Sequence, residues 1–233
     1  GMDKDLNFTG NQYSLLILLF YIPFGLLDLP LNLLTKRFSA RVTLPSLMVG
    51  WGAMALLQCA AKSFAGMLPM RLLLACFEAG FYCGVVFYMT LFYTRGELGF
   101  RLAIFFGSAL LAAAFSGLIS FGVFQIDHNS IQGWQWLFII EGGLTVIVGV
   151  IAWLWLPARP ETAWFLNDAE KQAARARSLR DSSKRLDTAF SWQAAFQTWK
   201  TWKFALWMLI CFTYPVAFAT TSNFLPQVGG SLI

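Results

Sequence analysis

The stretch of residues 64–93 most constrains what this chain can fold into, because it is a long apolar stretch whose only charged residues are Arg71 and Glu78. About 20 apolar residues span the hydrocarbon core of a bilayer, so this length predicts a membrane-crossing helix that is tilted or extends past the bilayer. Seven residues are almost two helical turns, and we therefore expect both charged side chains on one face. A charge at such depth costs at least about 2.5 kcal/mol, so it normally faces a polar cavity or a partner and serves function.

The composition excludes an ordinary soluble domain. Of the 233 residues, 58% are hydrophobic and only 12% are charged, whereas soluble domains are about 45–50% apolar and about 25% charged. The apolar residues fall in long blocks, a pattern that indicates membrane helices. The net charge of +5 comes from basic residues between these blocks. We therefore attribute it to cytoplasmic loops and expect a lipid bilayer, rather than a nucleic acid, as the partner.

Six membrane spans are predicted. They cover residues 13–34, 42–61, 64–93, 100–124, 136–156 and 204–225. Loops on one side of these spans carry fourteen Lys and Arg residues, and loops on the other side carry two. Because Lys and Arg gather in cytoplasmic loops, we expect the long polar segment 158–203 in the cytoplasm and both termini on the opposite side.

One helix is predicted inside the long polar segment. Asn167 or Asp168 is a suitable N-cap, and residues 169–180 are rich in Ala, Lys and Arg. This helix is either a solvated element beneath the membrane or a basic face that binds anionic lipid headgroups.

Small residues crowd the span 100–124, and Gly80 and Gly84 form a Gly-x-x-x-Gly pattern in the span before it. Such residues let helix backbones approach closely in a membrane. They predict tight packing within a bundle, although the moving interface of a transporter uses the same kind of surface.

Other polar residues in or beside the spans are weaker signals. Asp28 lies two residues before Pro30, and we expect it to have a buried partner, Arg95 or Arg101. Glu141 lies near the outer end of its span, where it either reaches water or pairs inside the bundle. The remaining candidates for pore lining are Asn11, Asn32, Gln58 and Asn223.

No enzyme signature stands in the chain. It has no H-E-x-x-H, G-x-S-x-G, Walker loop or G-x-G-x-x-G sequence. The four cysteines lack the spacing of metal ligands. We therefore expect no catalytic residues, no metal site and no bound cofactor.

Five motifs follow one another along the chain. They are DLPLNLLTKRF from Asp28, RLLLACFEAG from Arg71, YTRGELGFR from Tyr93, GWQWLFIIEG from Gly133 and LPARPETAWFL from Leu156. Together they resemble motifs of the major facilitator superfamily. The resemblance is closest to its anion:cation symporter branch and to the fungal allantoate-permease-like carriers within it. Ala75 departs from the pattern, because glycine is commoner there.

The resemblance implies an all-α integral membrane fold, a partial helical bundle whose six spans match helices two to seven of the family. Residues 1–156 would form the N-terminal half of a transporter without its first helix. Residues 157–203 would form the central cytoplasmic loop, and residues 204–233 the first helix of the C-terminal half. Complete carriers of this kind bind substrate near the membrane midplane between their two halves.

The resemblance also implies roles for individual residues. Arg71 would attract the carboxylate of a substrate, and Glu78 would take up and release the coupling proton. A charge network with a gating or structural role would be formed by Asp28, Arg95, Arg101 and Glu141.

The function implied is secondary active transport, namely the proton-coupled import of a small organic anion. Allantoate, nicotinate, pantothenate and similar vitamins or nitrogen sources are candidate substrates. The expected protein is a multi-pass monomer of the plasma membrane that is driven by the proton gradient. The alternative is a truncated product or partial gene model that keeps the fold without transporting.

Overall fold

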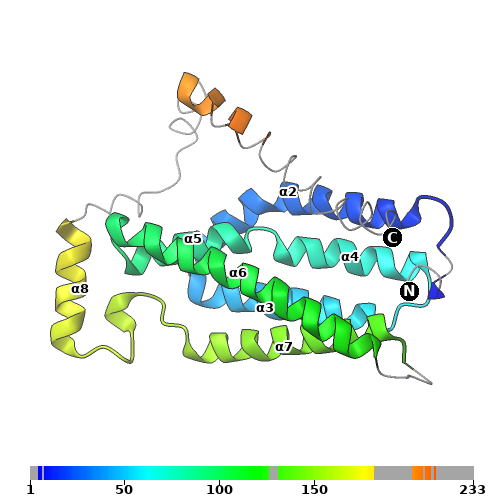
Figure 1. Cartoon of the computed structure of the whole chain (residues 1–233). Coiled ribbons are helices and arrows are strands. Elements are labelled where there is room, and N and C mark those ends of the chain that lie inside the picture. The colour runs from blue at the N-terminus through cyan, green and yellow to red at the C-terminus, as the bar shows by residue number, and fades with distance from the viewer. Residues whose placement is uncertain are drawn as a thin grey trace. The chain divides into compact units, whose positions relative to one another are not determined.

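The computed structural model describes residues 5–6, 8–125, 131–180, 201–206, 208–210 and 213. The chain divides into two units, Gly1–Lys184 and Arg185–Ile233. In chain order, the elements of the first unit are α2 (Gln12–Phe38), α3 (Ala40–Gln58), α4 (Phe64–Glu78), α5 (Phe81–Phe92), α6 (Arg95–Phe124), α7 (Gly133–Trp155), η1 (Pro160–Thr162) and α8 (Asp168–Arg180) (Figure 1). All the elements of this described part are helices, which confirms the predicted fold class.

Five helical segments of the described chain are long and apolar enough to cross a membrane. They are Gln12–Phe38, Ala40–Gln58, Phe64–Phe92, Arg95–Phe124 and Gly133–Trp155. These segments correspond to the first five predicted spans. The sixth, predicted over residues 204–225, lies mostly outside the described residues.

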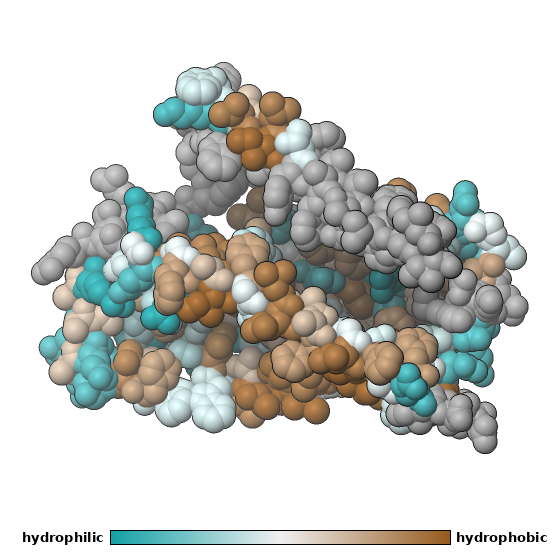
Figure 2. Space-filling view, in the orientation of Figure 1, coloured by the Kyte–Doolittle hydropathy of each residue, from teal (hydrophilic) through white to brown (hydrophobic). Residues whose placement is uncertain are grey.

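Apolar side chains cover the outside of these helices. On α6, Leu110 is 75% exposed, and on α7 Leu154 is 79% exposed. Figure 2 shows hydrophobic residues over the middle of the face drawn, with hydrophilic residues gathered towards its two ends. An apolar surface of this extent is unstable in water, because soluble proteins rarely expose large contiguous apolar patches. It suits contact with lipid.

The helix α3 packs most extensively against α7, and glycines make this contact close. A Cβ added at Gly142 would lie 2.9 Å from the backbone nitrogen of Leu56 and 3.0 Å from the carbonyl oxygen of Gly52. A Cβ at Gly149 would lie 2.9 Å from Val49. Small residues thus bring two backbones together here, as they commonly do between membrane helices.

We expect the substitution Gly142→Ala to lower the free energy of unfolding of the detergent-purified protein by about 1–3 kcal/mol, and therefore its melting temperature. The added methyl group meets backbone atoms, which cannot rotate away, so the two helices must separate. Gly143→Ala is the matched control, because a Cβ there lies 3.9 Å from Leu56 Cδ2, an ordinary contact. Equal melting temperatures of the two variants would contradict this account of the interface.

The third predicted span is interrupted in the structure. Residues 64–93 were expected to form one helix, but α4 ends at Glu78 and α5 begins at Phe81. Gly80 between them has φ of +72°, in the left-handed region, which glycine adopts without a steric penalty. A polar backbone break therefore lies within a candidate membrane span, directly after Glu78.

The glycines of α6 behave differently from those of α7. A Cβ at Gly107, Gly117 or Gly122 would meet nothing within 4 Å in the described part of the chain. At these three glycines, the predicted close packing is therefore not made with the described helices.

The predicted start of α8 is confirmed. The Asn167 side chain accepts a hydrogen bond from the Glu170 backbone N–H (3.0 Å), and the Glu170 carboxylate accepts one from the Asn167 backbone N–H (2.9 Å). This reciprocal pair is a capping box, which satisfies N–H groups that have no partner within the helix. Asn167 is thus the N-cap.

Candidate functional site

Arg71 lies at the middle of α4, where its guanidinium is held between two other helices. Its Nη1 donates a hydrogen bond to Gln58 Oε1 at the end of α3 (3.4 Å). Its Cζ lies 5.6 Å from the ring centroid of Phe20 on α2, a distance at which a cation is attracted to an aromatic face. The side chain is half-buried. An amide and a ring thus orient the guanidinium, while both leave its positive charge in place.

No carboxylate neutralises Arg71 in the described part of the chain. The ion pairs described there are Lys171–Asp168, within α8, and Arg177–Glu97, between α8 and α6. An arginine has five N–H donors, and the contact with Gln58 uses one of them. Among the described residues, the other donors of Arg71 have no hydrogen-bond partner.

Glu78 is the last residue of α4 and is also half-buried. It lies close to the middle of the 29-residue span Phe64–Phe92. Seven residues correspond to about 10 Å of helical rise from Arg71, and no ion pair within 4 Å joins the two side chains. The two residues are therefore separate positions about two turns apart along one helix.

The backbone break after Glu78 lies against α2. A Cβ added at Gly80 would lie 2.8 Å from Leu31 Cβ and 3.2 Å from the Asp28 carbonyl oxygen. The Asp28 carboxylate also contacts the first turn of α5, where Cys83 Sγ donates to Oδ2 at 3.9 Å. A negative charge near a helix N-terminus is favourable, because the N–H groups there carry partial positive charge. The carboxylates of Glu78 and Asp28 thus flank the break.

The other residues of the predicted charge network lie on α6 and α7. The Cζ atom of Arg101 lies 4.3 Å from the ring centroid of Tyr93. Arg95 is the first residue of α6. Glu141 on α7 accepts a hydrogen bond from Ser116 Oγ on α6. The charge network of Asp28, Arg95, Arg101 and Glu141 stays a prediction, as does the pairing of Asp28 with Arg95 or Arg101.

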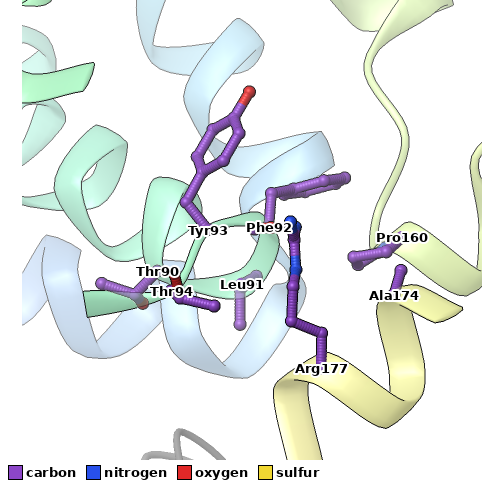
Figure 3. A pocket seen from close by; sticks show the side chains of 8 residues that line it. All are labelled: Thr90, Leu91, Phe92, Tyr93, Thr94, Pro160, Ala174 and Arg177. Atoms are coloured by element: carbon purple, nitrogen blue, oxygen red, sulfur yellow. Dashed lines mark hydrogen bonds between the residues drawn. The ribbon is translucent and has the colours of Figure 1, made fainter. Parts of the chain in front are cut away.

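A different arginine connects α8 to the spans. Arg177 of α8 reaches the α5–α6 junction (Figure 3), where Nη1 lies 3.2 Å from Glu97 Oε1 and Nη2 donates to the Phe92 carbonyl oxygen at 3.2 Å. Glu97 also accepts a hydrogen bond from the Thr94 backbone N–H. An exposed pair contributes up to about 1 kcal/mol, so this contact aligns α8 more than it stabilises the fold. No motif in the sequence predicted this contact.

Gln58, which contacts Arg71, was only weakly indicated as a site residue by the sequence. It was one of four weak candidates for pore lining, yet the structure places its amide against Arg71. Its only sequence signal was a polar residue near the end of an apolar span. Thirteen residues separate Gln58 from Arg71, and only the packing of α3 on α4 brings them together.

Comparisons with known proteins agree with this architecture. The sequence model of the Major Facilitator Superfamily matches residues 1–232. The chain is 58% identical over 232 residues to the "Major facilitator-type transporter hxnP" of Emericella nidulans, covering 98% of this chain and 47% of that protein. It is 46% identical over 228 residues to the "MFS-type transporter efuF" of Hormonema carpetanum, covering 98% of this chain and 46% of the relative.

A third relative is an "Uncharacterized transporter" of Schizosaccharomyces pombe, 44% identical over 228 residues, which cover 98% of this chain and 45% of the relative. The chain thus spans about half the length of the curated relatives it matches. The helices that hold Arg71, Glu78 and Gln58 lie within this shared half.

Proposed function

We propose, from the premise that this chain belongs to the Major Facilitator Superfamily, that its protein imports a small organic anion together with protons. The chain is an integral, multi-pass membrane protein with an all-helical fold. Its relatives are named transporters. Membership of the anion:cation symporter branch, likeness to allantoate permeases, a plasma-membrane location and a monomeric state are parts of the same proposal.

The proposal that the substrate is an anion rests on Arg71. Its guanidinium lies within a candidate membrane span, is oriented by Phe20 and Gln58, and has no carboxylate partner within 4 Å among the described residues. An uncompensated charge at such a position is costly, and an anionic ligand would offset that cost. The planar guanidinium fits a carboxylate well, because it donates two parallel hydrogen bonds. A small carboxylate such as allantoate, nicotinate or pantothenate meets this requirement.

The proposal that transport is coupled to protons rests on Glu78. It is half-buried in the middle of the same span, where burial disfavours the charged form of a carboxyl group. The positive charge of Arg71 has the opposite effect and favours the carboxylate. An anion that binds Arg71 would cancel part of that positive charge and so favour protonation of Glu78. Substrate binding and proton binding would then promote each other.

Uptake measurements test this proposal. The complete gene that encodes this chain is expressed in a yeast that lacks related carriers, and cells are offered radiolabelled allantoate, nicotinate, pantothenate and biotin. We expect one of these carboxylates to accumulate above its external concentration, together with alkalinisation of the medium, and a protonophore to abolish the accumulation. Accumulation that resists the protonophore would contradict proton coupling. Failure to take up any carboxylate of the panel would contradict the anion assignment.

A further inference from the structure

Gln58 has a buried side-chain amide in which the oxygen is hydrogen-bonded and the nitrogen is not. It is the last residue of α3 and has no exposed surface. Its oxygen accepts from Arg71, whereas its Nε2 has no hydrogen-bond partner in the described structure. A buried donor without a partner costs about 1–3 kcal/mol, and native proteins contain few of them. This donor therefore requires an explanation.

Chemistry fixes which way the amide points. Arginine has donors and no acceptor, so only the oxygen of Gln58 can face the Arg71 guanidinium. Nε2 is bonded to the same carbon as that oxygen, so its two N–H donors lie close to the Arg71 guanidinium and cannot be used by it. An acceptor placed beside Arg71 would thus find donors from two residues.

Gln135, on the neighbouring helix α7, shows what a fully used amide looks like at this end of the bundle. Its Nε2 donates to the Cys59 carbonyl oxygen at 2.7 Å, and its oxygen accepts from the Gln132 backbone N–H at 2.9 Å. Both halves of this amide are satisfied within the protein. Gln135 thus has a structural role within the protein, whereas the Nε2 donor of Gln58 has no partner in the described structure.

We infer that Gln58 is a specificity-determining residue of the anion site. Its oxygen orients Arg71, and its Nε2 donates a hydrogen bond to the same substrate carboxylate that the guanidinium attracts. This inference rests on the proposed function. It adds that the site recognises an anion with two acceptor oxygens close together, because one oxygen binds the guanidinium and the other binds the amide.

Two substitutions at Gln58 test the inference in the complete protein, with the carboxylate that the parent accumulates as the probe. Gln58→Met keeps the length of the side chain but removes the donor and the amide oxygen. Gln58→Glu keeps an acceptor for Arg71 but, when ionised, has no donor and repels an anion. We expect both variants to reach the membrane and to raise the KM for uptake by about tenfold or more, with little change in maximal rate.

Gln135→Met is the matched control. It removes hydrogen bonds that lie within the protein, so it should lower abundance or thermal stability and leave the KM of the surviving carrier unchanged. A KM for Gln58→Glu within twofold of the parent would overturn the inference, because an acceptor for Arg71 would then suffice. Loss of abundance with unchanged KM in both Gln58 variants would also overturn it. If the parent takes up none of the carboxylates, the proposed function fails and this inference fails with it.

Discussion

Replacement of Glu78 by glutamine is expected to abolish proton-driven accumulation of substrate while sparing downhill movement to a greater degree. Glutamine keeps the shape and hydrogen-bonding capacity of a protonated glutamate, but it cannot release a proton. Glu78 lies in the middle of the span Phe64–Phe92. Because an amide does not titrate, the variant would be uncharged at this position throughout the transport cycle. The measurement compares accumulation against a gradient with exchange of labelled for unlabelled substrate in vesicles.

The matched control for this change is Glu170→Gln in α8. It also removes one carboxylate, at a position where glutamine serves equally well as the third residue of a capping box, so we expect transport to be unchanged. A variant Glu78→Gln that accumulates substrate against a gradient as well as the parent does would show that the proton site lies elsewhere.

A purely structural role for Arg71 and Glu78 makes a different prediction. If the two charges only compensated each other, either single neutral variant would lose abundance in the membrane, and the double variant Arg71→Gln/Glu78→Gln would recover it. The structure favours separate roles, since no ion pair within 4 Å joins them and Arg71 instead contacts Gln58 and Phe20. We therefore expect no such recovery.

The helical fold could be predicted from the sequence because its signals are local. Long apolar blocks ended by charges located five spans that the structure describes. The start of α8 was predicted with Asn167 or Asp168 as N-cap, and the structure selects Asn167, which lies three residues before Glu170 as in a capping box. In each case, residues near one another in sequence determine the structure.

The site depends on contacts between helices, and these were less predictable. Gly80 belongs to a Gly-x-x-x-Gly pattern that indicates helix packing, and it does approach Leu31 of α2 closely. The same residue also breaks the helix, and the left-handed φ of +72° that makes the break cannot be inferred from the pattern. Gln58 acquires its importance from Arg71 on the next helix. Burial and pairing across elements determine such roles, and spacing along the chain does not encode them.

The second large effect is expected from Arg71→Lys, which should raise the KM for the substrate carboxylate by about tenfold to a hundredfold. Lysine keeps the positive charge, so an effect of this size would come from geometry. An ammonium group cannot donate two parallel hydrogen bonds to a carboxylate, and the shorter reach of lysine would weaken the contacts with Gln58 and Phe20 that orient the guanidinium. The measurement is the concentration dependence of uptake, corrected for the amount of carrier in the membrane.

Arg175→Lys is the matched control for this prediction. Arg175 lies on the exposed surface of α8, where a cation of either shape interacts mainly with water, so its KM should equal that of the parent. If Arg71→Lys also leaves the KM within twofold of the parent, charge alone attracts the substrate. The bidentate contact, and the second donor assigned to Gln58 beside it, would then both be wrong. If instead the KM rises while Arg71→Lys reaches the membrane in normal amounts, Arg71 acts on the substrate rather than on the fold.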